Sequence, residues 1–187
     1  ESGRISGEVL RMAGQNEIAL ERLIAPYWRG DRSPDLLAAL GIAERAANRT
    51  DRARKFLEKA VQEKTTRARA YAELARLRLD ENIAKAQAEK RKFTPEEVQS
   101  VLSPVEQGLQ KPPVMAEFYD VLAKVWTFAQ SAPDAQQFGA LLGGVRRYPD
   151  NLTLIFSTAQ VAVLHGYNQE ARLLINHGLE SAGSPEI

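Results

Sequence analysis

Residues of similar character, such as Ala, Leu or turn-forming residues, recur 34 positions apart along this chain, and this spacing constrains its fold more than any other feature. A period of this length is typical of proteins built from stacked helix pairs, because one pair cannot bury its own apolar face and needs a neighbour. The spacing therefore predicts a repeat architecture. The pairs in register are Gly14 and Asn48, Ala19 and Ala53, Leu23 and Leu57, Leu37 and Tyr71, Leu40 and Leu74, Gly41 and Ala75, and Val101 and Ala135.

Within each repeat the apolar residues recur at spacings of three and four, which is the helical period. No segment alternates with period two for long enough to predict a strand. Pro and Gly fall between the periodic segments, for example at Pro34, Pro95 and Gly166, and divide the chain into helices of ordinary length. We therefore expect an all-α fold of about ten helices in antiparallel pairs, with no sheet.

The clearest predicted helix start is at Thr94 and Pro95. Thr94 can cap the helix, and Pro95 suits the first helical position. Glu97 can close a capping box onto Thr94, and Phe93 can pack against Val98. Several independent signals thus predict the same boundary.

The last repeat unit is the most complete, with Ala159 in its first helix, Gly166 at the turn and Ala171 opening the second helix, before Gly178 and Leu179. This pattern resembles the tetratricopeptide repeat, a helix-turn-helix unit with small residues at these places. The resemblance covers nearly the whole chain and implies a right-handed α-solenoid of about five stacked antiparallel helix pairs. Other α-solenoids and a non-repeating helical bundle are the alternatives.

We predict one domain over residues 1–187. Its units are expected at about 1–33, 34–67, 68–115, 116–151 and 152–187, with an insertion at 81–94 in the third unit. The charged segment from Asp80 to Lys92 is expected to continue the first helix of that unit beyond its neighbours. It would then serve as a docking element or as a solvated spacer.

The first unit lacks an apolar first helix, because Gly3, Ser6 and Gly7 occupy positions that hold Leu, Tyr or Ile elsewhere. The sequence also begins at Glu1 without Met. We therefore expect this chain to be part of a longer protein, with residues before Glu1 completing the first helix.

The amino-acid composition excludes several kinds of functional site. The 187 residues include no cysteine and two histidines, which excludes a disulfide framework, a cysteine nucleophile and a thiolate metal site. His165 and His177 are predicted to be turn and packing residues. We expect no cofactor, no metal and no catalysis, and no stretch of about 20 apolar residues predicts a membrane span. The lack of cysteine is more typical of an exported bacterial protein, although it is compatible with the cytosol.

Charge is distributed unevenly along the chain. Residues 44–78 contain eleven basic and five acidic side chains, whereas residues after 99 contain five basic and eight acidic ones. A basic region can attract an acidic peptide, an anionic surface or RNA, or it can form a solvated helix face with internal ion pairs. No aromatic interleaving or RNA-binding motif accompanies the charge, so nucleic acid is the less favoured partner.

These observations predict a non-catalytic scaffold that binds a protein or peptide on a concave surface formed by the first helix of each unit. Arg45, Arg69 and Arg76 are expected to bind the carboxylates of an acidic partner. The asparagines of the carboxylate clamp found in some tetratricopeptide proteins have no counterpart here. The alternatives are a helical accessory domain of a larger enzyme or assembly factor, and RNA binding through the basic region. The full set of candidate partner-binding residues is Arg45, Arg69, Ala72, Arg76, Lys124, Phe156, Gln160 and Val163.

Overall fold

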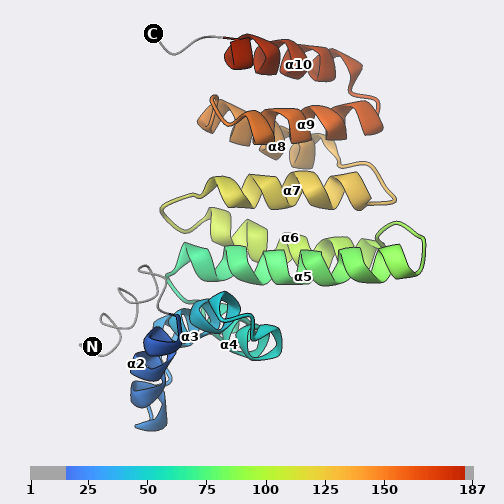
Figure 1. Cartoon of the computed structure of the whole chain (residues 1–187). Helices are drawn as coiled ribbons and strands as arrows, with labels where there is room; N and C mark the ends of the chain where they lie inside the picture. The colour runs from blue at the N-terminus through green and yellow to red at the C-terminus, as the bar shows by residue number, and fades with distance from the viewer. Residues whose placement is uncertain (1–15, 184–187) are drawn as a thin grey trace. The chain divides into compact units, whose positions relative to one another are not determined.

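A computed structural model describes residues 16–183, and the regular secondary structure in that range is entirely helical. The predicted all-α fold is therefore confirmed (Figure 1). One isolated bridge joins Phe93 and Ala129, so the described part of the chain contains no sheet. The helices are α2 (Asn16–Trp28), α3 (Pro34–Ala46), α4 (Thr50–Gln62), α5 (Ala68–Ala88), α6 (Pro95–Leu109), α7 (Ala116–Phe128), α8 (Ala135–Arg147), α9 (Leu152–Leu164) and α10 (Asn168–Gly183). The predictions on Gly3, Ser6, Gly7 and Gly14 lie outside the described residues.

The helices fall into two compact units. Unit 1 comprises Glu1–Arg78 and Pro104–Val114, and unit 2 comprises Leu79–Ser103 and Met115–Ile187. Helices α5 and α6 each have residues in both units.

The core of unit 1 is built by α2, α3, α4 and the first part of α5, which contributes Ala70, Leu74 and Leu77. Helix α3 is buried along most of its length, and Leu36, Leu37 and Leu40 are almost fully inaccessible. Gly41 permits the close approach of α4, because a Cβ atom there would lie 2.6 Å from Cγ of Leu57. The small residue that the repeat register places in this helix is thus required by packing.

A polar connection joins the start of α3 to the turn before α5. Oδ1 of Asp35 accepts hydrogen bonds from the Thr65 hydroxyl at 2.6 Å and the Thr66 amide at 3.0 Å, and Oδ2 accepts one from the Thr66 hydroxyl at 2.9 Å. Burial opposes the charge on Asp35, but these hydrogen bonds outweigh it and lower the pKa of the carboxyl group. The Tyr71 hydroxyl donates to the Thr65 carbonyl at 3.1 Å and fixes the same turn from α5.

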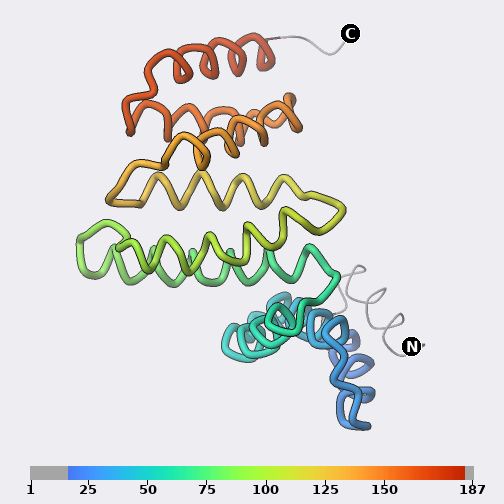
Figure 2. Tube along the Cα trace, turned by 180° about the vertical axis from the view of Figure 1, so that it is seen from behind, coloured from blue at the N-terminus to red at the C-terminus, as the bar shows by residue number. Residues whose placement is uncertain are grey.

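Unit 2 contains α7 to α10, and successive helices reverse direction in the chain trace (Figure 2). Helix α9 packs against α7, α8 and α10. Ala123 of α7, Ala159 of α9 and Ala171 of α10 are all buried, as the repeat register predicts for small residues at helix contacts. Gly166 turns the chain between α9 and α10 with a φ angle of +81°, a conformation that glycine adopts without strain.

The segment at 81–94 does not project beyond its neighbours. Helix α5 continues to Ala88, and α6 returns beside it from Pro95. Nδ2 of Asn82 donates to the Glu97 carbonyl at 3.0 Å and to the Ser100 hydroxyl at 3.2 Å. The predicted continuation of the helix is confirmed, but the prediction that it projects beyond its neighbours is wrong, because the start of α6 lies beside this part of α5 and hydrogen-bonds to it.

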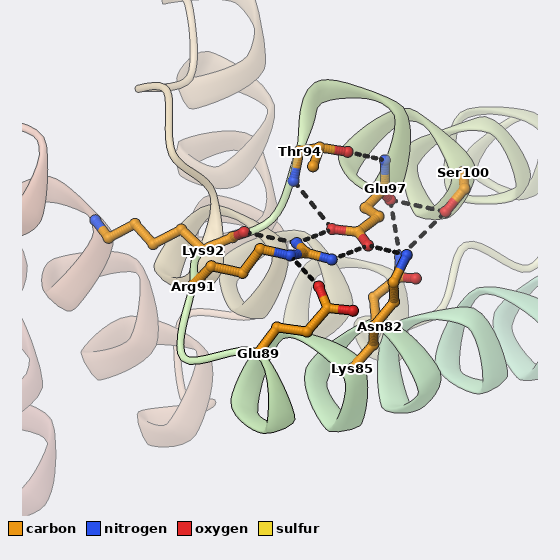
Figure 3. Close-up of polar contacts among 8 residues, drawn as sticks. All are labelled: Asn82, Lys85, Glu89, Arg91, Lys92, Thr94, Glu97 and Ser100. Carbon is orange, nitrogen blue, oxygen red and sulfur yellow. Dashed lines mark hydrogen bonds and ion pairs between the residues drawn. The ribbon is translucent and has the colours of Figure 1, made fainter.

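Glu97 is the centre of the polar network that joins these helices (Figure 3). Both guanidinium ends of Arg91 bind its carboxylate, at 2.6 and 2.7 Å, and Nζ of Lys85 lies 3.3 Å away. The Thr94 amide donates to Glu97 at 3.0 Å, and the Thr94 hydroxyl accepts from the Glu97 amide at 3.3 Å, so the predicted capping box is confirmed. The hydrogen bonds from Arg91 are the largest cause that lowers the pKa of Glu97, to about 2.

Phe93 attaches the same connection to α7. Its side chain is fully buried and stacks on Phe128 with ring centroids 5.4 Å apart. Its amide also donates to the Phe128 carbonyl at 2.9 Å, and its carbonyl accepts from the Gln130 amide at 3.3 Å. The charged segment thus ends in a residue held by both packing and backbone hydrogen bonds.

Candidate protein-binding surfaces

The four predicted binding residues of unit 1 differ in accessibility. Arg69 and Arg76 are exposed on α5, seven positions apart and therefore on one face of the helix. Ala72 lies between them and is only 7% exposed, so it adds little to that surface. Arg45 is half-buried in the last turn of α3.

Acidic residues within unit 1 already engage part of this basic region. The Arg69 guanidinium binds the Glu73 carboxylate of its own helix at 3.1 and 3.2 Å. Glu44 lies within 3.6 Å of Arg49 and 3.9 Å of Arg52. Arg69 would therefore have to exchange one carboxylate for another in order to bind a partner.

The predicted binding residues of unit 2 form an exposed stripe on α9. Phe156, Gln160 and Val163 follow one another at spacings of four and three, and Phe156 and Val163 are 40% and 57% exposed. Phe156 also contacts the second helix of its unit, because its ring lies along α10. Gly178 leaves room for it, since a Cβ atom there would be 2.8 Å from the ring. Lys124 is exposed on α7.

Helix α10 also carries accessible apolar side chains. Leu173, Ile175 and Leu179 are 69%, 38% and 60% exposed. Leu173 borders a shallow hollow with Leu142 and Val145 of α8. The end of unit 2 therefore presents apolar surface on both of its last two helices.

Unit 1 contains a groove that the sequence analysis did not predict. It has a volume of about 510 Å³ and lies between α2 and α4, with α3 as its floor. Its lining residues are Ile24, Tyr27 and Trp28 from α2, Leu37 and Glu44 from α3, and Arg52, Lys55, Phe56 and Lys59 from α4.

One wall of the groove is aromatic. Tyr27 packs edge-on against Phe56 with centroids 5.4 Å apart, and Trp28 is 5.8 Å from Tyr27. The Arg32 guanidinium lies 3.6 Å from the centre of the Tyr27 ring. Trp28 is nevertheless 75% exposed, so an indole ring remains open to a partner.

The other wall is basic. Arg52, Lys55 and Lys59 lie on one face of α4 at spacings of three and four, and all are exposed. Glu44 is the one acidic lining residue, and it is only 3% exposed. The spacing of these cations is visible in the sequence. The number of charges in residues 44–78 does not reveal this row of cations, because that number ignores which helix face each residue occupies.

Neither histidine shows the geometry of a metal ligand. His165 Nε2 is 2.8 Å from the Trp126 carbonyl, and His177 Nε2 is 3.1 Å from the Pro149 carbonyl. Both contacts join neighbouring loops and helices of unit 2. Across residues 16–183, no group of three or more His, Cys, Asp or Glu side chains is close enough to hold a metal ion.

No protein-family model matches the sequence, and no curated protein matches it either. Solved structures of MamA do match the fold. A crystal structure of MamA has a TM-score of 0.68 at 19% identity, covering 94% of each chain, and a MamA RS-1 ArsTM double mutant has a TM-score of 0.71 at 16% identity, covering 96% of this chain and 92% of that one. A further MamA crystal structure scores 0.68 at 19% identity, over 94% of this chain and 87% of that one.

MamA is a helical repeat protein of the tetratricopeptide type. This chain has a tetratricopeptide-like fold. Such folds commonly serve as protein-interaction scaffolds and are generally non-catalytic. Within the part of this tetratricopeptide-like chain that the structure describes, no helix is both long enough and apolar enough to cross a membrane.

Proposed function

We propose that this chain is a non-catalytic scaffold that binds another protein or a peptide through exposed side chains on the first helices of its repeats. The observation that carries this proposal is the stripe of Phe156, Gln160 and Val163 on α9. Exposed Phe and Val side chains become more stable when a partner removes them from water, and an adjacent amide can orient that partner by hydrogen bonding. The tetratricopeptide-like fold supports the same proposal, because its stacked helices expose such stripes side by side.

In unit 1, Arg76 is the predicted residue best placed to bind a carboxylate, since Arg69 is engaged by Glu73. Arg45 of α3 and Lys124 of α7 are the other basic residues among the candidates on first helices. We therefore expect a partner that combines acidic and apolar side chains.

The test compares partner capture by the wild-type chain and by a Phe156→Glu/Val163→Glu variant, using extract of the native organism. A carboxylate in each apolar position should abolish capture, because it would have to be desolvated in the interface. The matched control is Ile18→Glu, since Ile18 is an apolar α2 residue that is 45% exposed. Val163→Glu alone serves as a second variant, because Phe156 also packs on α10.

Capture that survives both α9 variants, with thermal unfolding unchanged, would contradict the proposed surface. Loss of capture in Ile18→Glu but not in Val163→Glu would move the binding surface to unit 1.

A further inference from the structure

The structure assigns a second interaction surface to unit 1: we infer that the groove between α2 and α4 binds an acidic amphipathic helix of a partner protein. This surface is distinct from the α9 stripe, because its walls come from second helices of the predicted units. It does not depend on the proposed function of the first helices.

The aromatic wall can receive the apolar face of such a helix. Ile24, Tyr27 and Trp28 share one face of α2, at spacings of three and four. Phe56 from α4 and Leu37 from α3 extend this apolar surface into the groove. A large exposed indole beside half-buried aromatic rings is typical of residues that contribute most to binding at protein interfaces.

The basic wall determines the charge of the partner. Arg52 and Lys59 are seven residues apart, or about 10 Å along the helix axis, with Lys55 between them. A partner helix that carries carboxylates at matching spacings of three and four over two turns would face all three cations. Charge complementarity along α4 therefore favours an acidic helix over a basic or neutral one.

These cations are available to a ligand. Lys55 has no ion-pair partner among residues 16–183. Lys59 lies 3.9 Å from Glu63, and both side chains are more than one third exposed. Arg52 lies 3.9 Å from Glu44, at the outer limit of an ion pair. Water screens the exposed contact between Lys59 and Glu63, so a partner carboxylate can replace it at low cost. Arg52 stays beside the buried Glu44 carboxylate, so Lys55 and Lys59 are the cations most available to a partner.

The aromatic geometry disfavours single-stranded nucleic acid as the occupant. Base stacking requires free ring faces. Tyr27 and Phe56 instead meet edge to face, and the Arg32 guanidinium covers a face of Tyr27. Only Trp28, among the rings that line the groove, is largely exposed.

The experiment uses the full chain and two synthetic helical peptides of about 18 residues. One peptide carries a Leu face flanked by Glu at spacings of three and four, and the other carries Lys in place of Glu. Binding is measured by fluorescence anisotropy of the labelled peptide. Tryptophan fluorescence provides a second readout, because Trp28 emission should shift to shorter wavelength when the peptide covers the ring. Trp126 is only 3% exposed, so its emission should not change on binding.

We expect the Glu peptide to bind, and the Lys55→Glu/Lys59→Glu variant to weaken it by about tenfold or more. The Lys peptide should prefer that variant over the wild-type chain, which a merely structural defect would not produce. The matched control, Lys92→Glu/Arg172→Glu, changes two exposed cations that lie outside both proposed surfaces and should leave affinity for the Glu peptide unchanged.

Three results would overturn this inference. One is equal binding of the Glu and Lys peptides by the wild-type chain. Another is loss of Glu-peptide binding in the Lys92→Glu/Arg172→Glu control but not in the groove variant. The third is failure of the Glu peptide to bind or to shift Trp28 emission, while single-stranded RNA binds with a steep salt dependence. None of these results would bear on the α9 stripe, so the two proposals fail separately.

Discussion

At the residue scale, small side chains decide how closely neighbouring helices approach. Gly143 and Gly144 are adjacent in α8, but they face different surroundings. A Cβ atom on Gly144 would collide with the Tyr119 ring and lie 3.0 Å from the Tyr119 Cβ, whereas a Cβ on Gly143 would meet nothing within 4 Å. Alanine substitutions at these two glycines therefore distinguish the effect of helix propensity on stability from the effect of packing against α7.

Gly144→Ala should destabilise the protein by about 1–3 kcal/mol, because the added methyl group overpacks the contact with α7. Gly143→Ala should stabilise it by roughly 0.5–1 kcal/mol, since alanine is the better helix former and the site is open. Urea unfolding followed by circular dichroism measures both changes. If Gly144→Ala were as stable as Gly143→Ala, the close approach of α7 and α8 would be wrong.

Ala159 offers a second residue-scale test, in the last repeat. It is 3% exposed in α9, at the position where the repeat register places a small residue. Ala159→Trp should lower the free energy of unfolding by several kcal/mol, because overpacking by far smaller groups already costs about 1–3 kcal/mol. An unchanged thermal unfolding temperature would show that the repeat register is wrong in this unit.

At the scale of the element, local signals predicted helix starts better than they predicted helix extents. Thr94, Pro95 and Glu97 fixed the start of α6, because capping depends on residues within one turn. The path of residues 81–94 could not be predicted in the same way. It depends on Asn82, Arg91 and Phe93 meeting residues that are distant in the sequence or on the next helix.

The Glu97 network makes stability depend on pH in a defined direction. Its folded pKa of about 2 lies below the ordinary value of 4.5, so the ionised carboxylate stabilises the fold above pH 4.5. That stabilisation is lost as the pH falls through about 2. Glu97→Gln should therefore unfold at lower temperature than wild type at pH 7, and the difference should shrink towards pH 2.

Thermal unfolding at several pH values measures this convergence. Glu106→Gln is the matched control, since Glu106 is an exposed carboxylate of the same helix. A Glu97→Gln deficit that stays constant from pH 7 to pH 2 would mean that the carboxylate charge does not hold α5 and α6 together.

At the scale of the whole molecule, the 34-residue spacing was sufficient to predict the fold, because buried small residues must recur wherever helix pairs stack. The surfaces were harder to predict. The exposed positions of Phe156, Gln160 and Val163 follow from helical periodicity alone. The groove beside Trp28 is formed by side chains from three helices, and a local sequence pattern cannot predict that these side chains come together.

Site-specific photo-cross-linking tests directly whether first-helix side chains bind a protein partner. Photo-reactive benzoylphenylalanine replaces Gln160 in the α9 stripe or, as the control, the exposed Arg172 of α10. After irradiation in extract of the native organism, we expect a discrete protein adduct from position 160 that excess unmodified chain competes away, and no such adduct from position 172. An adduct from position 172 alone, or none from either position, would contradict partner binding by the α9 stripe.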